Sequence, residues 1–194
     1  MTTPALTVAI LAGGAASRLG GRDKGLELLA GKPMIEWVVR ACPHEAERVV
    51  VANRNLDEYA RFGRVTTDAE AGFQGPLAGV ASALAAATTP RVMTLPVDCP
   101  DPPADLARRL AAALDASGAG AAVAHDGERR QPLFALYRRE LAASAAAAVE
   151  GGQGVWQWQS AVGARELDFG DRQRQFRNLN TPQEFADYAA EHAL

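Results

Sequence analysis

A glycine-rich segment near the start of the chain holds residue types that could bind phosphate. Residues 11–33 (LAGGAASRLGGRDKGLELLAGKP) follow an apolar run and carry Arg18, Lys24 and Lys32. Glycines after a strand let backbone N–H groups come close to phosphate oxygens, and arginine and lysine add cations. The spacing is neither the G-x-G-x-x-G pattern nor a Walker A loop. We therefore expect a phosphate-binding loop of another kind; the alternative is a flexible surface loop with incidental charges.

Three polar residues that follow other apolar runs could complete such a site. Asn53, Asp68 and Asp98 each come just after a short run of strand-forming residues. Ligands of open α/β sheets lie at the carboxyl ends of the strands, so these side chains are expected to face the glycine-rich loop. Asp98 there could hold a Mg²⁺ that bridges to phosphates. The alternatives are that Asp98 caps a following helix and that Asn53 and Asp68 are turn residues.

These residues can meet only if the apolar runs are neighbouring strands. Apolar runs of strand length alternate along the chain with segments whose apolar residues have helical spacing. The expected strands are 6–11, 48–52, 64–67, 91–95, 121–124 and 132–137, and the expected helices are 34–42, 77–87, 104–116 and 140–149. The alternation predicts a three-layer α/β fold around a mostly parallel central sheet.

The end of the chain carries a clear helix start. Thr181, Pro182 and Glu184 have the spacing of an N-cap, a first-turn proline and a capping box, which predicts a terminal helix to about His192. Residues 151–154 (GGQG) form a break that is too short to separate a second domain. We expect residues 1–194 to form a single domain.

Composition excludes several classes of protein. The 194 residues carry a formal net charge of -3, which offers no general basic field for nucleic acid. Cys42 and Cys99 do not form a C-x-x-C pair, so a reducing compartment is expected. The apolar N-terminal run is too short to span a membrane and lacks a preceding basic stretch. A cytoplasmic protein with no membrane partner is the resulting prediction. Lys24 and Lys32 are the chain's lysines among 20 basic residues.

The order of motifs along the chain resembles the molybdenum cofactor guanylyltransferase family. The matching elements are LAGG-x-x-S-R-L-G-G-x-D-K-G-L, then G-K-P, V-A-N-R, a lone Asp68, G-P-L-A-G, P-V-D-C-P, H-D-G-E-R and N-L-N-T-P-Q-E. The resemblance implies a Rossmann-like nucleotidyltransferase fold. It also implies an enzyme that transfers GMP from GTP to the terminal phosphate of molybdenum-molybdopterin and releases pyrophosphate, with Mg²⁺ as cofactor.

The resemblance assigns roles to individual residues. Leu11, Ala12 and Gly13 match the segment whose backbone contacts the guanine nucleotide. Arg18 and Lys24 match triphosphate contacts. The resemblance further places Asn53 and Asp68 in the nucleotide pocket and makes Asp98 the magnesium ligand. Arg18, Lys24 and Asp98 are thus the expected catalytic residues, because charge neutralisation and positioning dominate phosphoryl transfer.

The C-terminal part is expected to bind the molybdopterin acceptor, through less definite residues. Residues 75–79 could bring a helix N-terminus to an anion, and residues 125–132 could supply cations or simply form a hairpin turn. Asn178 and Asn180 are expected to serve helix capping and strand-end hydrogen bonds rather than a ligand. Trp156 and Trp158 could pack on a pterin ring, although core packing is the commoner use of tryptophan at helical spacing.

Other activities remain open at this point. A cytidylyltransferase acting on the same cofactor, another nucleotidyltransferase, and a non-catalytic cofactor carrier are the alternatives. Cytidylyl relatives typically have LAAG where this chain has LAGG at 11–14, which favours guanine. The resemblance also implies transient contacts with other cofactor-synthesis proteins and with molybdoenzyme chaperones.

Overall fold

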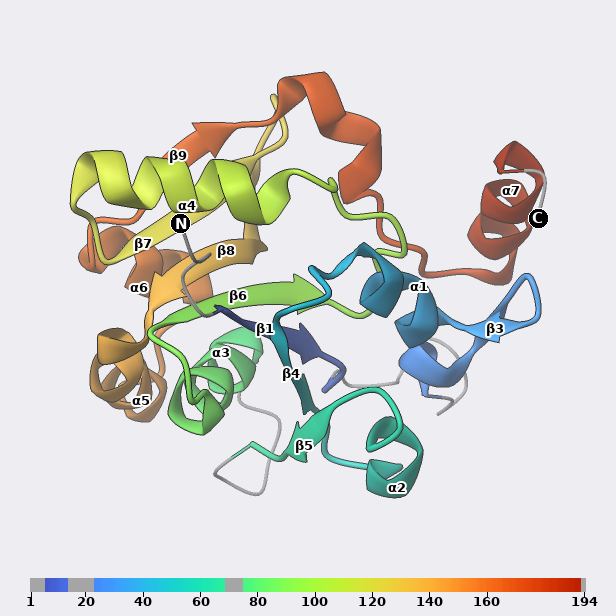
Figure 1. Cartoon of the computed structure of the whole chain (residues 1–194), viewed down its shortest axis with the longest axis horizontal. Helices are drawn as coiled ribbons and strands as arrows, with labels where there is room; N and C mark the ends of the chain where they lie inside the picture. Colours follow the sequence, from blue (N-terminus) through green and yellow to red (C-terminus); the bar gives the residue numbers. More distant parts are fainter. Residues whose placement is uncertain (1–5, 14–22, 69–74, 193–194) are drawn as a thin grey trace.

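A mostly parallel sheet organises the molecule. The computed structural model describes residues 6–13, 23–68 and 75–192. Within these ranges a seven-stranded sheet has the order β5-β4-β1-β6-β8-β7-β9 (Figure 1). Its strands are β1 (Leu6–Leu11), β4 (Glu47–Val51), β5 (Arg64–Thr66), β6 (Arg91–Pro96), β7 (Ala121–His125), β8 (Arg130–Arg138) and β9 (Arg165–Asp168). A separate hairpin pairs β2 (Leu28–Leu29) with β3 (Lys32–Pro33).

Strand β1 is at the centre of the parallel half of the sheet. It pairs in parallel with β4 and β6, and β4 pairs in parallel with β5. Val8, Ala9 and Ile10 have no exposed surface, as expected for a strand that is covered on both faces. The carboxyl ends of β5, β4, β1 and β6 therefore lie side by side at one edge.

Strand β8 is the exception to the parallel arrangement. It runs antiparallel to both β6 and β7. Residues 126–129 form the tight connection that joins β7 to β8. The Asp126 carboxylate accepts hydrogen bonds from the backbone N–H groups of Glu128 (2.9 Å) and Arg129 (2.8 Å) and so holds this turn. The hairpin-turn interpretation of residues 125–132 is confirmed.

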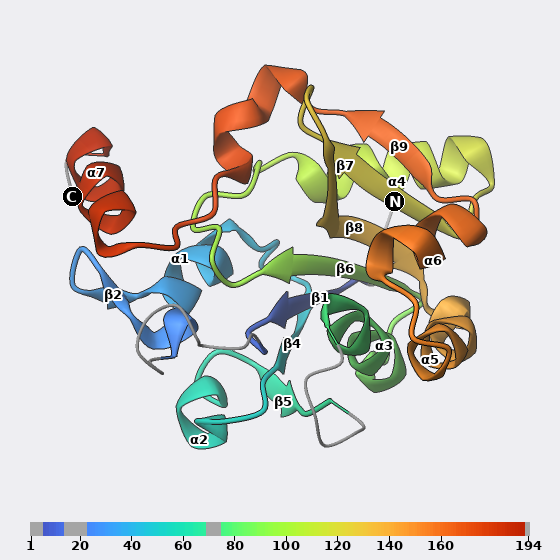
Figure 2. The same cartoon turned by 180° about the vertical axis from the view of Figure 1, so that it is seen from behind.

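Helices cover both faces of the sheet. On one face are α1 (Met34–Ala41) and α4 (Leu106–Ser117); on the other are α3 (Pro76–Ala86), α5 (Ala142–Glu150) and α6 (Val155–Ala161). The turned view in Figure 2 shows α3, α5 and α6 together on their side. The predicted three-layer α/β fold is confirmed. Short elements are α2 (Leu56–Tyr59) and the 3-10 segments η2 (Lys24–Leu26), η3 (Arg139–Leu141) and η4 (Gly170–Phe176).

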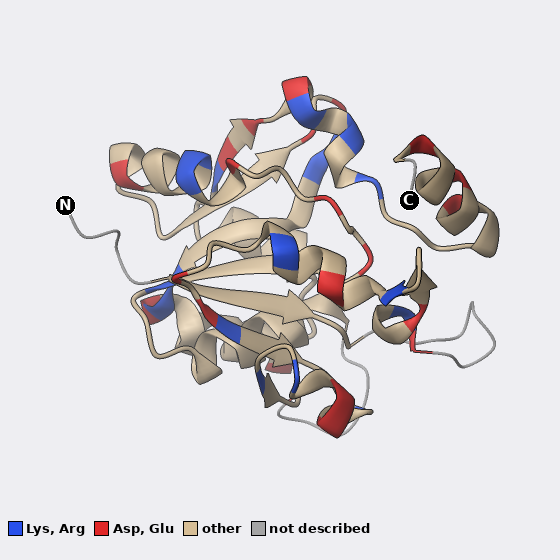
Figure 3. Ribbon diagram, turned by 45° about the vertical axis from the view of Figure 1, so that its right-hand side comes forward, with Lys and Arg blue, Asp and Glu red and all other residues tan. Residues whose placement is uncertain are grey.

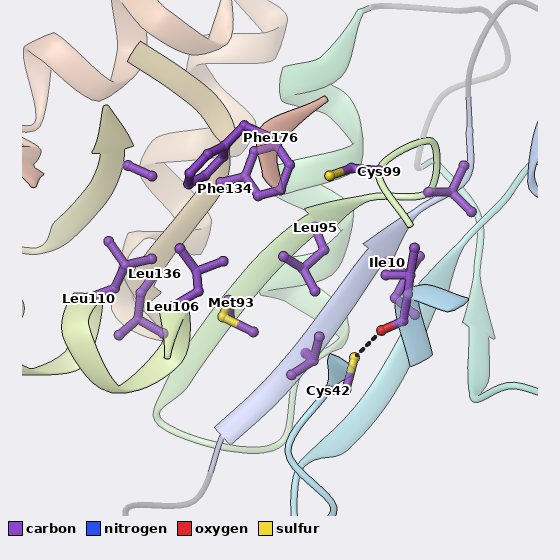
Figure 4. Packing of buried hydrophobic residues seen from close by; sticks show 14 of the residues in the cluster. Ile10, Cys42, Met93, Leu95, Cys99, Leu106, Leu110, Phe134, Leu136 and Phe176 are labelled. Atoms are coloured by element: carbon purple, nitrogen blue, oxygen red, sulfur yellow. Dashed lines mark hydrogen bonds between the residues drawn. The ribbon is translucent and has the colours of Figure 1, made fainter. Parts of the chain in front are cut away.

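The larger core lies between the sheet and the α1/α4 layer. Figure 4 shows Phe134 of β8 and Phe176 of η4 in contact, with ring centroids 4.9 Å apart. The buried thiol of Cys42 donates to the Val38 carbonyl at 3.3 Å, and burial raises its pKa to about 12. The thiol of Cys99 donates to the Gln175 carbonyl at 3.1 Å, and burial raises its pKa as well. Both cysteines are free, as the sequence predicts.

The C-terminal helix α7 (Pro182–Glu191) packs away from the central sheet. Its Tyr188 forms a small apolar cluster with Leu29, Met34 and Leu179, beside the β2–β3 hairpin and α1 (Figure 1). The predicted capping box is present, because the Thr181 hydroxyl accepts from Glu184 N–H and the Glu184 carboxylate accepts from Thr181 N–H. The helix is therefore fixed at its start and along one side.

Charged residues are spread over the surface elements. Figure 3 shows basic and acidic segments interspersed on helices and connections, while the interiors of the strands are mostly uncharged. None of the helices in the described ranges has the length and apolar character needed to cross a membrane.

Candidate active site

Four of the predicted site residues follow different strands and lie at the carboxyl edge of the sheet. Gly13 follows β1, Asn53 follows β4, Asp68 follows β5 and Asp98 follows β6. The backbone there is tied across strands: Ala12 N–H donates to the Val51 carbonyl at 2.9 Å, and Val97 N–H donates to the Leu11 carbonyl at 3.1 Å. The prediction that these positions share one edge is confirmed. Arg18 and Gly14 lie outside the described residues.

Asn53 and Asp68 form a reciprocal pair. The Asn53 carboxamide donates from Nδ2 to Asp68 Oδ2 at 2.7 Å and accepts at Oδ1 from Asp68 N–H at 2.9 Å. A Cβ on Gly13 would lie 3.5 Å from Asn53 Nδ2 and 3.7 Å from Asp68 Oδ2, so Gly13 is next to the pair. The bonds join the ends of β4 and β5, so these residues do more than stabilise local turns.

The second carboxylate oxygen of Asp68 is available for a ligand. Asp68 Oδ1 is buried and has no hydrogen-bond partner among the described residues. It lies beside the first turn of α3, where a Cβ on Gly79 would be 4.0 Å from it. A desolvated acceptor without a donor is costly, which makes this atom a candidate ligand contact.

Lys24 and Asp98 form the charged centre of the site. The Lys24 ammonium donates to Asp98 Oδ2 at 2.7 Å and to Asn180 Oδ1 at 2.6 Å. The side chains of Lys24 and Asp98 are each 22% exposed, so the pair is accessible to a small ligand. The helix-cap alternative for Asp98 is wrong, because α4 begins at Leu106 with Asp105 as its N-cap residue.

Asp23 holds the loop that carries Lys24. Its Oδ1 accepts from Gly25 N–H at 3.2 Å and from the Tyr59 hydroxyl, while its Oδ2 accepts from Asn55 Nδ2 at 2.9 Å. Arg54 Nε lies 3.3 Å from Oδ2, and the Asp23 side chain is only 6% exposed. Burial and the bond to Asp23 raise the pKa of Tyr59 above its ordinary value.

Close packing beside Lys24 explains the glycine that follows it. A Cβ on Gly25 would collide with the Tyr59 hydroxyl and lie 2.9 Å from Val97 Cγ2. The sequence motifs predict a role for Lys24 alone in the D-K-G element. The anchoring of the Lys24 loop was not predicted, although Asp23 and Gly25 of the same element could have indicated it.

Asn180 joins the cap of α7 and also reaches the Lys24–Asp98 pair. Its backbone N–H does join the cap network, donating to Glu184 Oε2 at 2.6 Å. Its side chain, however, contacts Lys24, 156 positions away in the sequence. Leu179 N–H also donates to the Asp98 carbonyl at 2.9 Å, which fastens the 98 and 179–180 segments together. The expected capping role of Asn180 is confirmed by its backbone bond, and its side chain adds a long-range contact that the sequence did not predict.

The segments expected on the acceptor side have structural partners of their own. Arg130 binds the Glu166 carboxylate and the Ser160 hydroxyl, and its guanidinium lies 5.6 Å from the ring centroid of Trp156. Trp156 is 63% exposed, whereas Trp158 is buried in the core. Gly75 precedes α3 with φ +80°, and no side chain caps that helix.

Asp98 is the candidate metal ligand of the site. The described residues contain no group of three or more His, Cys, Asp or Glu side chains that could hold a metal ion. Mg²⁺ is commonly bound by one or two carboxylates together with substrate phosphates, so the accessible Asp98 carboxylate beside the Lys24 ammonium fits that mode. It does not fit a closed structural metal site.

The fold is that of the nucleotidyltransferases. A molybdopterin-guanine dinucleotide biosynthesis protein A from Archaeoglobus fulgidus superposes with a TM-score of 0.79 over 96% of this chain and 98% of that chain, at 21% sequence identity. The family described as "MobA-like NTP transferase domain" matches residues 8–166. The chain belongs to this family, which confirms the resemblance drawn from its motifs.

Curated relatives match nearly the whole chain. A molybdenum cofactor guanylyltransferase of Mannheimia succiniciproducens is 42% identical over 181 residues, covering 92% of this chain and 95% of the relative. One from Shewanella sp. (strain ANA-3) is 43% identical over 185 residues, covering 94% of each. The similarity thus extends beyond residue 166 into the C-terminal segment that carries Asn180 and α7.

Proposed function

We propose that this chain transfers GMP from GTP to the terminal phosphate of molybdenum-molybdopterin and releases pyrophosphate. The observation that carries the proposal is the accessible Lys24–Asp98 pair at the carboxyl edge of the sheet. The names of relatives 42–43% identical over nearly their full lengths support the choice of nucleotide and acceptor. The product would be the guanine dinucleotide form of the cofactor.

The donor nucleotide is assigned to the edge formed by β5, β4, β1 and β6. In this assignment the backbone at Leu11, Ala12 and Gly13 and the side chains of Asn53 and Asp68 bind the nucleoside part. Lys24 contacts the triphosphate, with Arg18 as a second cation. Asp68 Oδ1 supports the nucleoside role, because it is a buried acceptor still without a donor in the described residues.

The reaction requires charge neutralisation more than proton transfer. An oxygen of the acceptor phosphate bonds to the α-phosphorus of GTP, and the bond from that phosphorus to the bridging oxygen of pyrophosphate breaks. Two anions must approach, so the ammonium of Lys24 lowers the barrier by balancing their charge. A phosphate monoester is already largely ionised near neutral pH, because its second pKa is about 6. No general base is needed at the attacking oxygen.

The Lys24 ammonium can serve a ligand while keeping its protein contacts. Ammonium has three N–H donors, and two are directed at Asp98 and Asn180. The third has no partner among the residues that the structure describes and is assigned to a phosphate oxygen. Asp98 is the residue that would hold Mg²⁺, and the ion would neutralise phosphate charge there when bound. Dependence on Mg²⁺ is part of the proposal.

The cellular setting follows from the same proposal. Free, buried cysteines are consistent with a reducing compartment, and we place the protein in the cytoplasm. The acceptor and product are the cofactor itself, so transient contacts with other cofactor-synthesis proteins and with molybdoenzyme chaperones are expected.

A comparison of nucleotides tests this function against its alternatives. The protein is incubated with molybdenum-molybdopterin, Mg²⁺ and GTP, CTP, ATP or UTP in turn, and pyrophosphate is measured. Release with GTP, dependent on the acceptor, is the expected result. Release with CTP but not GTP would identify a cytidylyltransferase, and binding of the cofactor without pyrophosphate release from any nucleotide would identify a carrier.

A further inference from the structure

Lys24, the residue assigned to the triphosphate, has two protein partners of different charge. Asp98 offers Lys24 a carboxylate at 2.7 Å, and Asn180 offers a neutral carboxamide oxygen at 2.6 Å. Asn180 comes from the C-terminal segment, beyond residues 8–166 that the family domain matches. A residue outside that domain therefore completes the hydrogen bonding of a central cation in the candidate donor site.

Asn180 is held where it is by contacts on both sides. Its N–H donates to Glu184 Oε2 at 2.6 Å, within the cap network of α7. The preceding residue, Leu179, is buried and donates its N–H to the Asp98 carbonyl at 2.9 Å. The Asn180 oxygen is thus fixed relative to both Asp98 and the start of α7.

Helix α7 is fixed in turn against the elements that follow Lys24. Tyr188 and Leu179 pack with Leu29 of β2 and Met34 of α1, and Phe185 packs against the same cluster. The elements after Lys24 and the C-terminal segment consequently share one apolar cluster. Movement of Asn180 away from Lys24 would have to break this cluster or the cap.

We propose that Asn180 is a positioning residue for the donor triphosphate, acting through Lys24. Its carbonyl oxygen orients the ammonium without adding a second negative charge to that of Asp98. A carboxylate at the same place would be a second one beside Asp98, and the surplus negative charge around the ammonium would repel the phosphates. This inference rests on the proposed function, because it takes a nucleoside triphosphate as the ligand.

The test measures nucleotide binding without the acceptor. Calorimetric titration with Mg²⁺ and GTP or GMP compares the wild-type chain with Asn180→Ala, Asn180→Asp, Lys24→Ala and the double variant Asn180→Ala/Lys24→Ala. Asn178→Ala is the matched control, since it removes an exposed side chain two positions away in the same segment. Thermal unfolding checks that each variant is folded.

The expected pattern separates positioning from other roles. Asn180→Ala weakens GTP binding about tenfold, the scale of one hydrogen bond to a charged group, and leaves GMP binding unchanged, because GMP lacks the β and γ phosphates. Asn180→Asp, which keeps the shape and adds a negative charge, weakens GTP binding at least as much. The double variant binds GTP no more weakly than Lys24→Ala. Asn178→Ala binds like wild type.

Three results would overturn the inference while leaving the proposed function intact. They are wild-type GTP affinity in Asn180→Ala, equal losses for GTP and GMP, and losses that multiply in the double variant. A wild-type chain that fails to bind GTP would instead overturn the proposed function itself.

Discussion

The carboxamide of Asn53 and the carboxylate of Asp68 bond to each other twice, from the ends of neighbouring strands. Nδ2 of Asn53 lies 2.7 Å from Asp68 Oδ2, and Oδ1 of Asn53 lies 2.9 Å from the Asp68 backbone nitrogen. This pairing turns the other carboxylate oxygen, Oδ1, into a fixed and buried acceptor. The arrangement fits recognition of an N–H or O–H group of a nucleoside.

Asp68→Asn should weaken GTP binding with little effect on folding. The variant replaces a charged acceptor by a neutral one, and hydrogen bonds to charged groups contribute roughly 1.5–3 kcal/mol. A loss of about tenfold in GTP affinity is expected, measured by calorimetric titration alongside the melting temperature. Unchanged affinity in a folded variant would remove Asp68 from the nucleotide pocket.

Lys24→Arg should preserve the fold but reduce transfer at least tenfold. A planar guanidinium cannot place one compact charge on Asp98, Asn180 and a phosphate together, as an ammonium can. The other lysine supplies the control: Lys32 lies 3.9 Å from Glu36, with 42% of its side chain exposed. Lys32→Arg should keep full activity in the same pyrophosphate assay. Equal activity of the two variants would show that the ammonium is not required.

Gly25→Ala should destabilise the protein and disturb the lysine loop. The added methyl would overlap the Tyr59 hydroxyl and press on Val97, and such overpacking typically costs about 1–3 kcal/mol. Gly154→Ala is a suitable control, because φ is -81° there and no described residue beyond its chain neighbours lies within 4 Å of the added Cβ. Denaturant unfolding of both variants measures the difference. A Gly25→Ala protein as stable as Gly154→Ala would contradict the packing described.

Glu47 should stabilise the fold in a pH-dependent way. Burial alone would raise its pKa, but hydrogen bonds from Thr7, Arg64 and Thr88 outweigh burial and lower the pKa from 4.5 to about 2. Because the folded pKa is depressed, the stabilisation is present above about pH 4.5 and is lost as the pH falls towards 2. Glu47→Gln should therefore lower the free energy of unfolding at pH 7 by about 1–3 kcal/mol.

The comparison of the two proteins across pH checks this account of Glu47. The difference in unfolding free energy between wild type and Glu47→Gln should shrink as the pH is lowered from 5 to 2. A difference that is independent of pH in this range would assign the effect of the substitution to packing alone.

The sequence predicts the parallel half of the fold well, for a physical reason. Strands β1, β4 and β6 are buried on both faces and so form continuous apolar runs, and polar residues at their ends mark the sheet edge. The elements α2, α6 and β9 were not predicted. All three are short, and β9 (Arg165–Asp168) carries charged residues, so none of them has a strong periodic pattern.

The site was predictable only where its residues lie in local motifs. Lys24 and Asp98 stand in recognisable elements, and so does Asp23, although its anchoring role requires Tyr59 and Asn55 to be near it in space. Asn180 shows the limit most clearly. Its contact with Lys24 spans 156 positions and depends on the docking of α7, which sequence spacing does not encode.

GMP transfer at the Lys24–Asp98 pair should depend on the Asp98 carboxylate. The most direct test is the rate of pyrophosphate release from GTP and molybdenum-molybdopterin as Mg²⁺ is varied, for wild type and Asp98→Asn. We expect Mg²⁺-dependent release by wild type and a rate at least a hundredfold lower in Asp98→Asn, because this variant loses the carboxylate assigned to the metal. An Asp98→Asn protein that keeps full Mg²⁺-dependent transfer would show that the reaction does not use this carboxylate.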